Sequence, residues 1–191
     1  MQYPDEHPDY PSDKENFYGW LMQFKDGNRI DLHVESIVHA KENILSDKLC
    51  VILLDKDNLL PEMPQATDED YYVKMPSERQ YLCACNEFWW CLNNVAKGLW
   101  RAEMPYVQDM LNFIVRKQLE KMLAWKVGII TDFSVSVGKS AKYMYRWLSE
   151  EEWKEYLSTF CGADVEDCWD AVFGMCDLFE TVALFVGEKL G

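Results

Sequence analysis

The spacing of apolar residues divides this chain into a strand-like N-terminal part and a helical C-terminal part. Residues 29–38 alternate between apolar and polar side chains, which predicts a strand with one apolar face. Residues 25–28, Lys-Asp-Gly-Asn, have the composition of a turn and connect this strand to an aromatic, apolar run at residues 17–24. The two runs therefore predict a β-hairpin. The continuous apolar run at residues 49–54 predicts a further, buried strand.

From residue 77 onward, apolar positions recur with the period of an α-helix. Ser77 with Gln80, and Ser149 with Glu152, form capping boxes that mark two helix starts, and Pro105 suits the first turn of another helix. Residues 60–75 are expected to form a loop or linker. We expect antiparallel helices over residues 77–101, 105–126, 139–148, 149–160 and 164–188. The sequence thus predicts an α+β fold, with a sheet part over residues 1–75 and an all-helical bundle over residues 76–191.

The chain is strongly acidic, with 33 Asp and Glu against 19 Lys and Arg among 191 residues and a formal net charge of −14. Such a charge repels a phosphate backbone and disfavours a nucleic-acid-binding function. It favours a cationic small-molecule ligand, although acidity that serves only solubility also explains it. No apolar run is long enough to cross a bilayer, and the acidic, proline-rich start is unlike a signal peptide. We therefore expect a cytoplasmic protein with no membrane partner, whose seven cysteines are small buried hydrophobic residues.

The helix expected around residues 86–101 has two unlike faces. Its core-facing stripe consists, at helical spacing, of Phe88, Leu92, Val95 and Leu99. The opposite stripe carries both charge signs and amide groups and is flanked by indole rings; its members are Glu87, Asn94, Lys97, Arg101, Trp89 and Trp90. This composition is typical of a pocket wall for a polar ligand. The alternative is a solvated helix face whose tryptophans belong to the core.

The polar face of the strand at residues 29–38 is a candidate for chemistry. Asp31, His33 and Glu35 occupy alternate positions and so point to one side of the strand. Three ionisable groups on one face can hold a divalent metal or act as a general base. An edge strand with a wet polar face gives the same pattern, and the sequence leaves both interpretations open.

Residues 136–142 place lysines just after a glycine at an expected helix start. The segment is like the end of a Walker phosphate loop, but Phe133 stands where the first glycine of that motif belongs, so a Walker loop is rejected. Lys139 and Lys142 lie about one turn apart and could still bind phosphate at a helix N-terminus. A basic helix cap with no ligand is the alternative.

Four segments in order along the chain resemble the streptomycin (aminoglycoside) 6-adenylyltransferases: FKDGNRIDLHV, LLDKDNLL, NEFWWCLNNVAKGLWRAEM and GKSAKYMYRWLSEEEW. The resemblance implies an antibiotic-resistance enzyme that transfers AMP from ATP to a hydroxyl of streptomycin, with Mg²⁺. It also implies a partial nucleotidyltransferase-type mixed sheet followed by a helical domain, with nucleotide and drug meeting in the cleft between them.

The resemblance also implies roles for individual residues. Asp31 would accept the proton of the attacking hydroxyl and could share in binding magnesium. Lys139, and less surely Lys142, would contact the triphosphate. Contacts to the cationic aminoglycoside would come from Glu87, Asn94 and Trp90. The acidic charge would then draw in a drug that carries guanidinium groups.

One part of the family pattern is missing from the sequence. A Gly-Ser pair at a helix start, followed by paired aspartates on a strand, is expected before residues 17–24 and does not occur there. We therefore expect an N-terminally incomplete or shortened relative whose 191 residues alone are inactive or nearly so. A non-catalytic relic, or a binding module for a cationic small molecule or partner, is the alternative, and a plain helical interaction domain is a third. A sheet edge left exposed would favour a homodimer.

Overall fold

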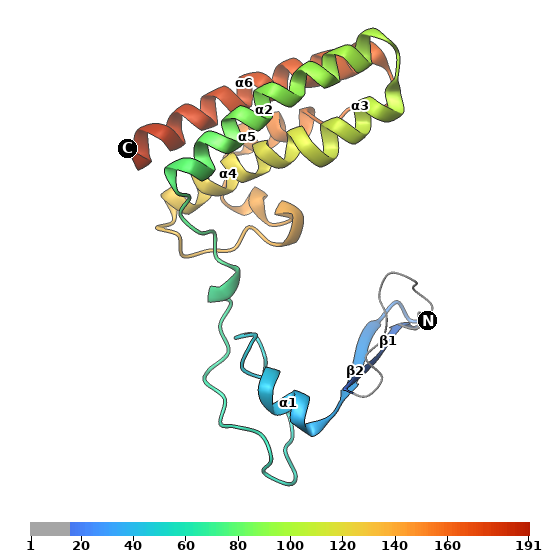
Figure 1. The fold of residues 1–191 in the computed structure, drawn as a ribbon, viewed down its shortest axis with the longest axis vertical. Coiled ribbons are helices and arrows are strands. Elements are labelled where there is room, and N and C mark those ends of the chain that lie inside the picture. The colour runs from blue at the N-terminus through green and yellow to red at the C-terminus, as the bar shows by residue number, and fades with distance from the viewer. Residues whose placement is uncertain (1–15) are drawn as a thin grey trace. The chain divides into compact units, whose positions relative to one another are not determined.

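The structure is a computed structural model that describes residues 16–191. Its residues fall into two compact units, Met1–Asp70 and Tyr71–Gly191, and the helices and strands of each are labelled in Figure 1. A two-stranded sheet lies in the first unit and a helical bundle in the second. The predicted α+β class is therefore confirmed.

The first unit contains the predicted hairpin. Strands β1 (Phe17–Gln23) and β2 (Arg29–Glu35) pair antiparallel, with Trp20 opposite Leu32. At the turn between them, the Asp26 carboxylate accepts a hydrogen bond from the backbone N–H of Asn28 at 3.0 Å, and Gly27 has φ of +88°, which glycine adopts without strain. Ser36 caps the short helix α1 (Ile37–Asn43) by accepting from the His39 N–H.

The prediction of a buried strand at residues 49–54 is wrong. Leu53 is 94 % exposed and Leu54 71 % exposed, and the segment has no regular secondary structure. The Asp47 carboxylate accepts from the backbone N–H of Leu49, which bends the chain at the start of the run. An apolar run becomes a strand only where a neighbouring strand offers hydrogen-bonding groups, and β1 and β2 pair only with each other among residues 16–191. Every residue of β2 is exposed, including its apolar face, so the homodimer stays a prediction.

The helices of the second unit begin where the capping boxes predicted. Helix α2 (Glu78–Trp100) starts after Ser77, and α5 (Glu150–Ser158) starts after Ser149; both capping boxes are complete. Helix α6 (Val165–Leu190) is capped by the Asp164 carboxylate. The single helix predicted at residues 105–126 is a continuous helical segment made of α3 (Met104–Met110), a π-helical turn η3 (Leu111–Val115) and α4 (Arg116–Ile130). Residues 60–75 form a loop with one 3₁₀ turn, η2 (Glu69–Tyr71), as expected.

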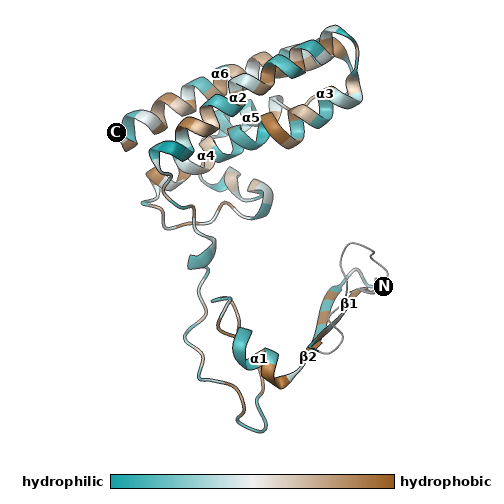
Figure 2. Cartoon of the chain, viewed as in Figure 1, coloured by the Kyte–Doolittle hydropathy of each residue, from teal (hydrophilic) through white to brown (hydrophobic). Residues whose placement is uncertain are grey.

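The core of the bundle lies between α2, α4 and α6. Phe88 on α2 stacks on Phe179 of α6 with ring centroids 3.6 Å apart, and the Tyr81 hydroxyl donates to the Ala183 carbonyl oxygen. These pairs match the start of α2 with the end of α6, so the two helices run antiparallel (Figure 1). The predicted core stripe of α2 is buried at Phe88, Val95 and Leu99 and half-buried at Leu92. Apolar and polar residues accordingly mix along α2 and α6 in Figure 2.

The prediction of a helix at residues 139–148 is also wrong. Two 3₁₀ turns occupy this segment, η4 (Lys139–Ala141) and η5 (Met144–Arg146). Gly138, Ser140 and Ala141 have φ of +73°, +54° and +60°, a left-handed backbone that an α-helix cannot include. Within residues 16–191, no helix combines the length and the apolar content needed to cross a membrane.

Candidate functional site

Asp31 lies on β2 and is held by a neighbouring arginine. The Arg29 guanidinium donates from Nε to Asp31 Oδ1 at 3.0 Å and from Nη2 to Oδ2 at 2.9 Å. Residues two apart on a strand share a face, which makes this two-pronged contact possible. The hydrogen bonds from Arg29 lower the pKa of the Asp31 carboxyl, so the group is ionised at neutral pH. In this state Asp31 is able to accept a proton.

His33 and Glu35, the other two ionisable residues on this face of β2, each contact a different neighbour. The His33 ring packs edge-on against Phe17 with centroids 4.6 Å apart, and a Cβ at the facing Gly19 would come within 3.0 Å of it. The Glu35 carboxylate contacts Nδ1 of the His39 ring on α1. Within the described part of the chain, no three His, Cys, Asp or Glu side chains are arranged to hold a metal ion. These residues therefore do not fit a magnesium site by themselves.

The three residues predicted to contact the drug share one face of α2. Glu87, Trp90 and Asn94 are spaced i, i+3 and i+7 along the helix. Trp90 is 70 % exposed and Glu87 is exposed, whereas Asn94 is half-buried. The Glu87 carboxylate also accepts a hydrogen bond from the Cys91 thiol at 3.5 Å. The interpretation that the tryptophans belong to the core is wrong for Trp90, which leaves an indole and a carboxylate open to a ligand.

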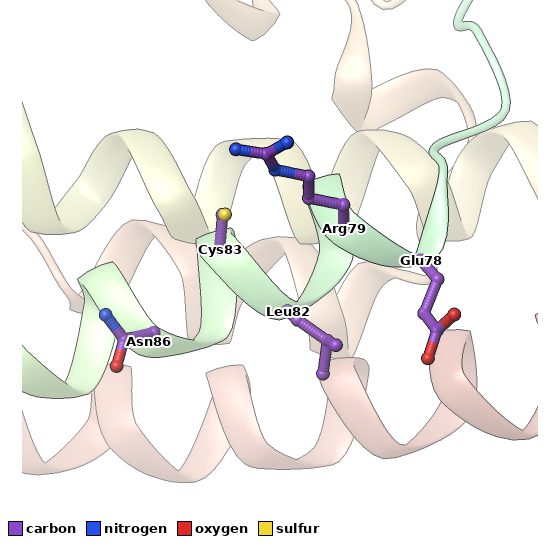
Figure 3. A pocket seen from close by; sticks show the side chains of 5 residues that line it. All are labelled: Glu78, Arg79, Leu82, Cys83 and Asn86. Atoms are coloured by element: carbon purple, nitrogen blue, oxygen red, sulfur yellow. The ribbon is translucent and has the colours of Figure 1, made fainter.

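A shallow hollow continues this helix face toward the start of α2. It has a volume of about 430 Å³ and is lined by residues of that helix alone: Glu78, Arg79, Leu82, Cys83 and Asn86. Figure 3 shows Arg79 and Cys83 projecting toward the upper edge of the helix and Glu78, Leu82 and Asn86 toward its lower edge. The hollow is therefore an open surface of one helix, and it does not by itself form the expected cleft.

Both predicted phosphate-binding lysines lie in the connection between α4 and α5. Lys139 and Lys142 are exposed, and the Lys142 Nζ lies 4.8 Å from the centroid of the Tyr143 ring. Because the segment forms short 3₁₀ turns, the α-helix N-terminus expected to assist phosphate binding is not there. Binding of phosphate by these lysines would have to rely on their side-chain charges.

Sequence reasoning missed two residues of this connection, Arg146 and Tyr143. Arg146 places its guanidinium carbon 4.2 Å from the centroid of the same Tyr143 ring that Lys142 contacts. A signal was present in the sequence, because residues 133–149 contain Lys139, Lys142 and Arg146 but no aspartate or glutamate. Such a stretch stands out in a chain with 33 acidic residues.

The candidate residues belong to different units of the chain. Asp31 lies in the unit Met1–Asp70, and the residues proposed to bind drug and triphosphate lie in Tyr71–Gly191. The expectation that Asp31, Glu87 and Lys139 line one cleft stays a prediction. Each group is nevertheless accessible for its expected chemistry, since all three side chains are exposed.

Comparison with known proteins identifies relatives along the whole chain. The chain is 35 % identical over 191 residues to the aminoglycoside 6-adenylyltransferase of Bacillus subtilis (strain 168). This alignment covers 100 % of this chain and 67 % of the relative. It is 36 % identical over 190 residues to that of Campylobacter jejuni, with coverage of 100 % and 66 %. The corresponding protein of Staphylococcus aureus is 33 % identical over 181 residues, with coverage of 94 % and 64 %. The chain thus spans about two thirds of the length of these curated relatives.

The fold agrees with this relationship. A crystal structure of an aminoglycoside 6-adenyltransferase from Bacillus subtilis aligns with a TM-score of 0.59 and 34 % identity, covering 99 % of this chain and 70 % of that one. The family model for streptomycin adenylyltransferase matches residues 1–191. From the first residue to the last, the chain belongs to the streptomycin adenylyltransferase family.

Proposed function

We propose that this protein acts in the transfer of AMP from ATP to a hydroxyl group of a streptomycin-type aminoglycoside, in the cytoplasm and as a determinant of antibiotic resistance. One observation carries the proposal: identity of 33–36 % extends across 94–100 % of the chain to three relatives, each named as an aminoglycoside 6-adenylyltransferase. Similarity spread over both units, and not confined to one motif, is expected when both contribute to the same reaction.

In the proposed reaction, the sugar oxygen attacks the α-phosphorus of ATP, pyrophosphate leaves, and the hydroxyl proton passes to a base. Asp31 is the proposed base: its carboxylate is exposed and ionised at neutral pH, and the two hydrogen bonds from Arg29 fix its position. Lys139 and Lys142 are proposed to offset the charge of the triphosphate. Such a transfer depends mainly on positioning and on charge neutralisation.

The exposed face of α2 is proposed to bind the drug. The Glu87 carboxylate suits a guanidinium group, which can donate two parallel hydrogen bonds to it. Trp90 offers a flat, 70 % exposed ring on which a cationic group or a sugar can rest, and Asn94 offers an amide one turn away. The net charge of −14 accelerates the encounter with a polycation at low ionic strength.

Calorimetric titration of the chain with streptomycin and with ATP and magnesium tests the substrates. We expect both to bind, and we expect Glu87→Gln to weaken streptomycin binding about tenfold because it removes a charged hydrogen-bond acceptor. Glu180→Gln, at an exposed position of α6, is the matched control and should leave the affinity unchanged. A chain that binds neither substrate would contradict the proposed function.

Radiolabelled AMP transfer tests the proposed base. Asp31→Asn should abolish whatever transfer the chain shows, whereas Asp57→Asn, an exposed carboxylate in the same unit, should not alter it. We also expect the 191-residue chain to turn over far more slowly than its Bacillus subtilis relative, because the Gly-Ser pair and paired aspartates expected before residues 17–24 do not occur there. Turnover comparable to that of the relative would contradict this expectation.

A further inference from the structure

The connection between α4 and α5 is locally positive in an acidic protein. Residues 133–149 carry three cations, Lys139, Lys142 and Arg146, and no carboxylate, although the chain as a whole has a net charge of −14. All three side chains are exposed, and none forms an ion pair with a carboxylate of residues 16–191. Asp132 and Glu150 border the segment, so its positive charge is local, and an anion that reaches it meets three cations that no ion pair among the described residues neutralises.

The aromatic ring of Tyr143 contacts two of these cations. The Lys142 Nζ lies 4.8 Å and the Arg146 Cζ 4.2 Å from the Tyr143 centroid, both within the range of a cation–π contact. Arg146 Nε also lies 3.4 Å from the Tyr145 hydroxyl, which limits how the guanidinium can turn. Two exposed cations therefore contact the same ring, which places both of them around Tyr143.

The backbone fixes the ring that holds them. The Tyr143 N–H donates to the Val137 carbonyl oxygen at 2.9 Å, and the neighbouring Met144 is fully buried in the bundle core. Gly138, with φ of +73°, lies so close that a Cβ there would come within 2.6 Å of Tyr143 Cδ2. The ring is thus packed into a left-handed turn instead of swinging freely, and it gives the cations a rigid base.

We propose that Arg146 binds the polyphosphate chain of the nucleotide together with Lys142, and that Tyr143 is the residue that positions them. The inference rests on the proposed function for the identity of the anion. A guanidinium presents a planar fork that matches two phosphate oxygens, and an ammonium supplies a compact point charge beside it. A pair of this kind suits a ligand with several adjacent phosphates better than one with a single phosphate.

Equilibrium dialysis of the whole chain with inorganic tripolyphosphate, ATP and AMP tests the proposal. We expect tripolyphosphate to compete with ATP, AMP to bind more weakly than either, and Arg146→Gln to weaken ATP and tripolyphosphate binding about tenfold through loss of a charge-assisted contact. Arg79→Gln makes the same charge change at an exposed position in the first turn of α2, away from Glu87, Trp90 and Asn94, and should leave both affinities within a factor of two. Equal losses in the two variants would overturn the proposal, because they would indicate a general charge effect.

Two substitutions of one residue separate positioning from simple packing. Tyr143→Phe keeps the ring and should bind tripolyphosphate like the unaltered chain, whereas Tyr143→Leu keeps an apolar side chain but loses the cation–π face and should bind several-fold more weakly. Circular dichroism melting of both variants shows whether each remains folded. Rescue of binding by Phe but not by Leu supports the positioning role, and equal binding in the two variants overturns it.

The outcomes distinguish this inference from the proposed function. If the unaltered chain binds ATP and streptomycin but Arg146→Gln binds ATP equally well, the inference is overturned and the proposed function stands. If Arg146→Gln weakens tripolyphosphate binding while the chain neither binds streptomycin nor modifies it, the anion site stands and the proposed function is overturned. If the unaltered chain binds neither tripolyphosphate nor ATP, the inference is overturned.

Discussion

The guanidinium group of Arg116 donates a hydrogen bond over 2.7 Å to the backbone carbonyl oxygen of Thr159. A second nitrogen donates to the Thr159 hydroxyl oxygen, and Nε donates to Asn112. Arg116 is only 3 % exposed, and its guanidinium lies 3.7 Å from the centroid of the Phe160 ring. One buried cation on α4 therefore holds the end of α5 in place, and burial lowers the pKa of its guanidinium.

Replacing the hydroxyl partner of this cation should destabilise the bundle. Thr159→Val keeps the shape of the side chain but leaves a buried charged donor without its acceptor, which should lower the free energy of unfolding by about 1–3 kcal/mol. Urea denaturation measures the loss. Thr181→Val removes a hydroxyl that bonds the Asp177 carbonyl oxygen on the exposed side of α6, and it should change stability by less than about 0.5 kcal/mol. Equal effects at the two positions would show that Arg116 does not depend on Thr159.

Helix starts were predictable because their signals are local. In both Ser77 with Gln80 and Ser149 with Glu152, the serine and its partner three residues later satisfy each other's backbone groups, so four residues define the structure. The hairpin turn is equally local, since Asp26, Gly27 and Asn28 supply the side-chain contact and the positive φ that it needs. Elements that are defined by a few consecutive residues can be predicted from a single sequence.

The two wrong elements depended on information outside their own residues. The apolar run around Leu53 needed a partner strand to become a ladder, and apolarity alone does not reveal whether one is present. The segment after Gly138 kept a helix-compatible composition, but packing of Tyr143 against that glycine coincides with left-handed backbone at Ser140 and Ala141. In neither case does the composition of the segment reveal which contacts its residues make.

The candidate site was predictable only in part for a similar reason. The spacing placed Glu87 on a polar stripe with Trp90 beside it, but it left open whether the tryptophans belong to the core. The gathering of Lys142 and Arg146 on one ring was not predictable from spacing, because it depends on the non-helical path between them. The absence of carboxylates from residues 133–149 was visible, but it indicated a charge and not a geometry.

The close approach of α2 and α3 should make one helical glycine irreplaceable. A Cβ at Gly98 would come within 2.7 Å of Val107 Cγ2, and Val107 is fully buried and cannot move aside. Gly98→Ala should therefore lower the free energy of unfolding by about 1–3 kcal/mol through overpacking.

The matched control for this substitution lies on α6. Gly174 has no atom within 4 Å of the place a Cβ would take, so Gly174→Ala should raise stability by about 0.5–1 kcal/mol through helix propensity alone. Chemical denaturation measures the free energy of unfolding of the two variants. A Gly98→Ala variant that is more stable than the unaltered chain would refute the packing argument.

Removing Arg29 should raise the pKa of Asp31. The hydrogen bonds from Arg29 are the largest cause of the lowered pKa, so Arg29→Gln should return the carboxyl toward its ordinary value. Because the folded pKa is the lower one, the contact favours the folded chain above the ordinary pKa of aspartate and is lost as the pH falls through the lowered value. Carbon-detected NMR titration of the Asp31 carboxyl measures the shift. An unchanged titration in Arg29→Gln would show that the contact does not form in solution.

Cysteine reactivity should follow burial, and not every cysteine is buried as the sequence suggested. Cys83 is exposed on α2, whereas burial raises the pKa of the Cys168 thiol to about 12 and that of Cys176 to about 11. Since only the thiolate reacts, roughly one Cys168 in ten thousand is reactive at pH 8. Iodoacetamide followed by peptide mass spectrometry should label Cys83 first, and raising the pH toward 11 should accelerate labelling at Cys176. Cys83→Ser should remove the fast phase, and labelling of Cys168 in the folded chain as rapidly as Cys83 would mean that the start of α6 opens readily.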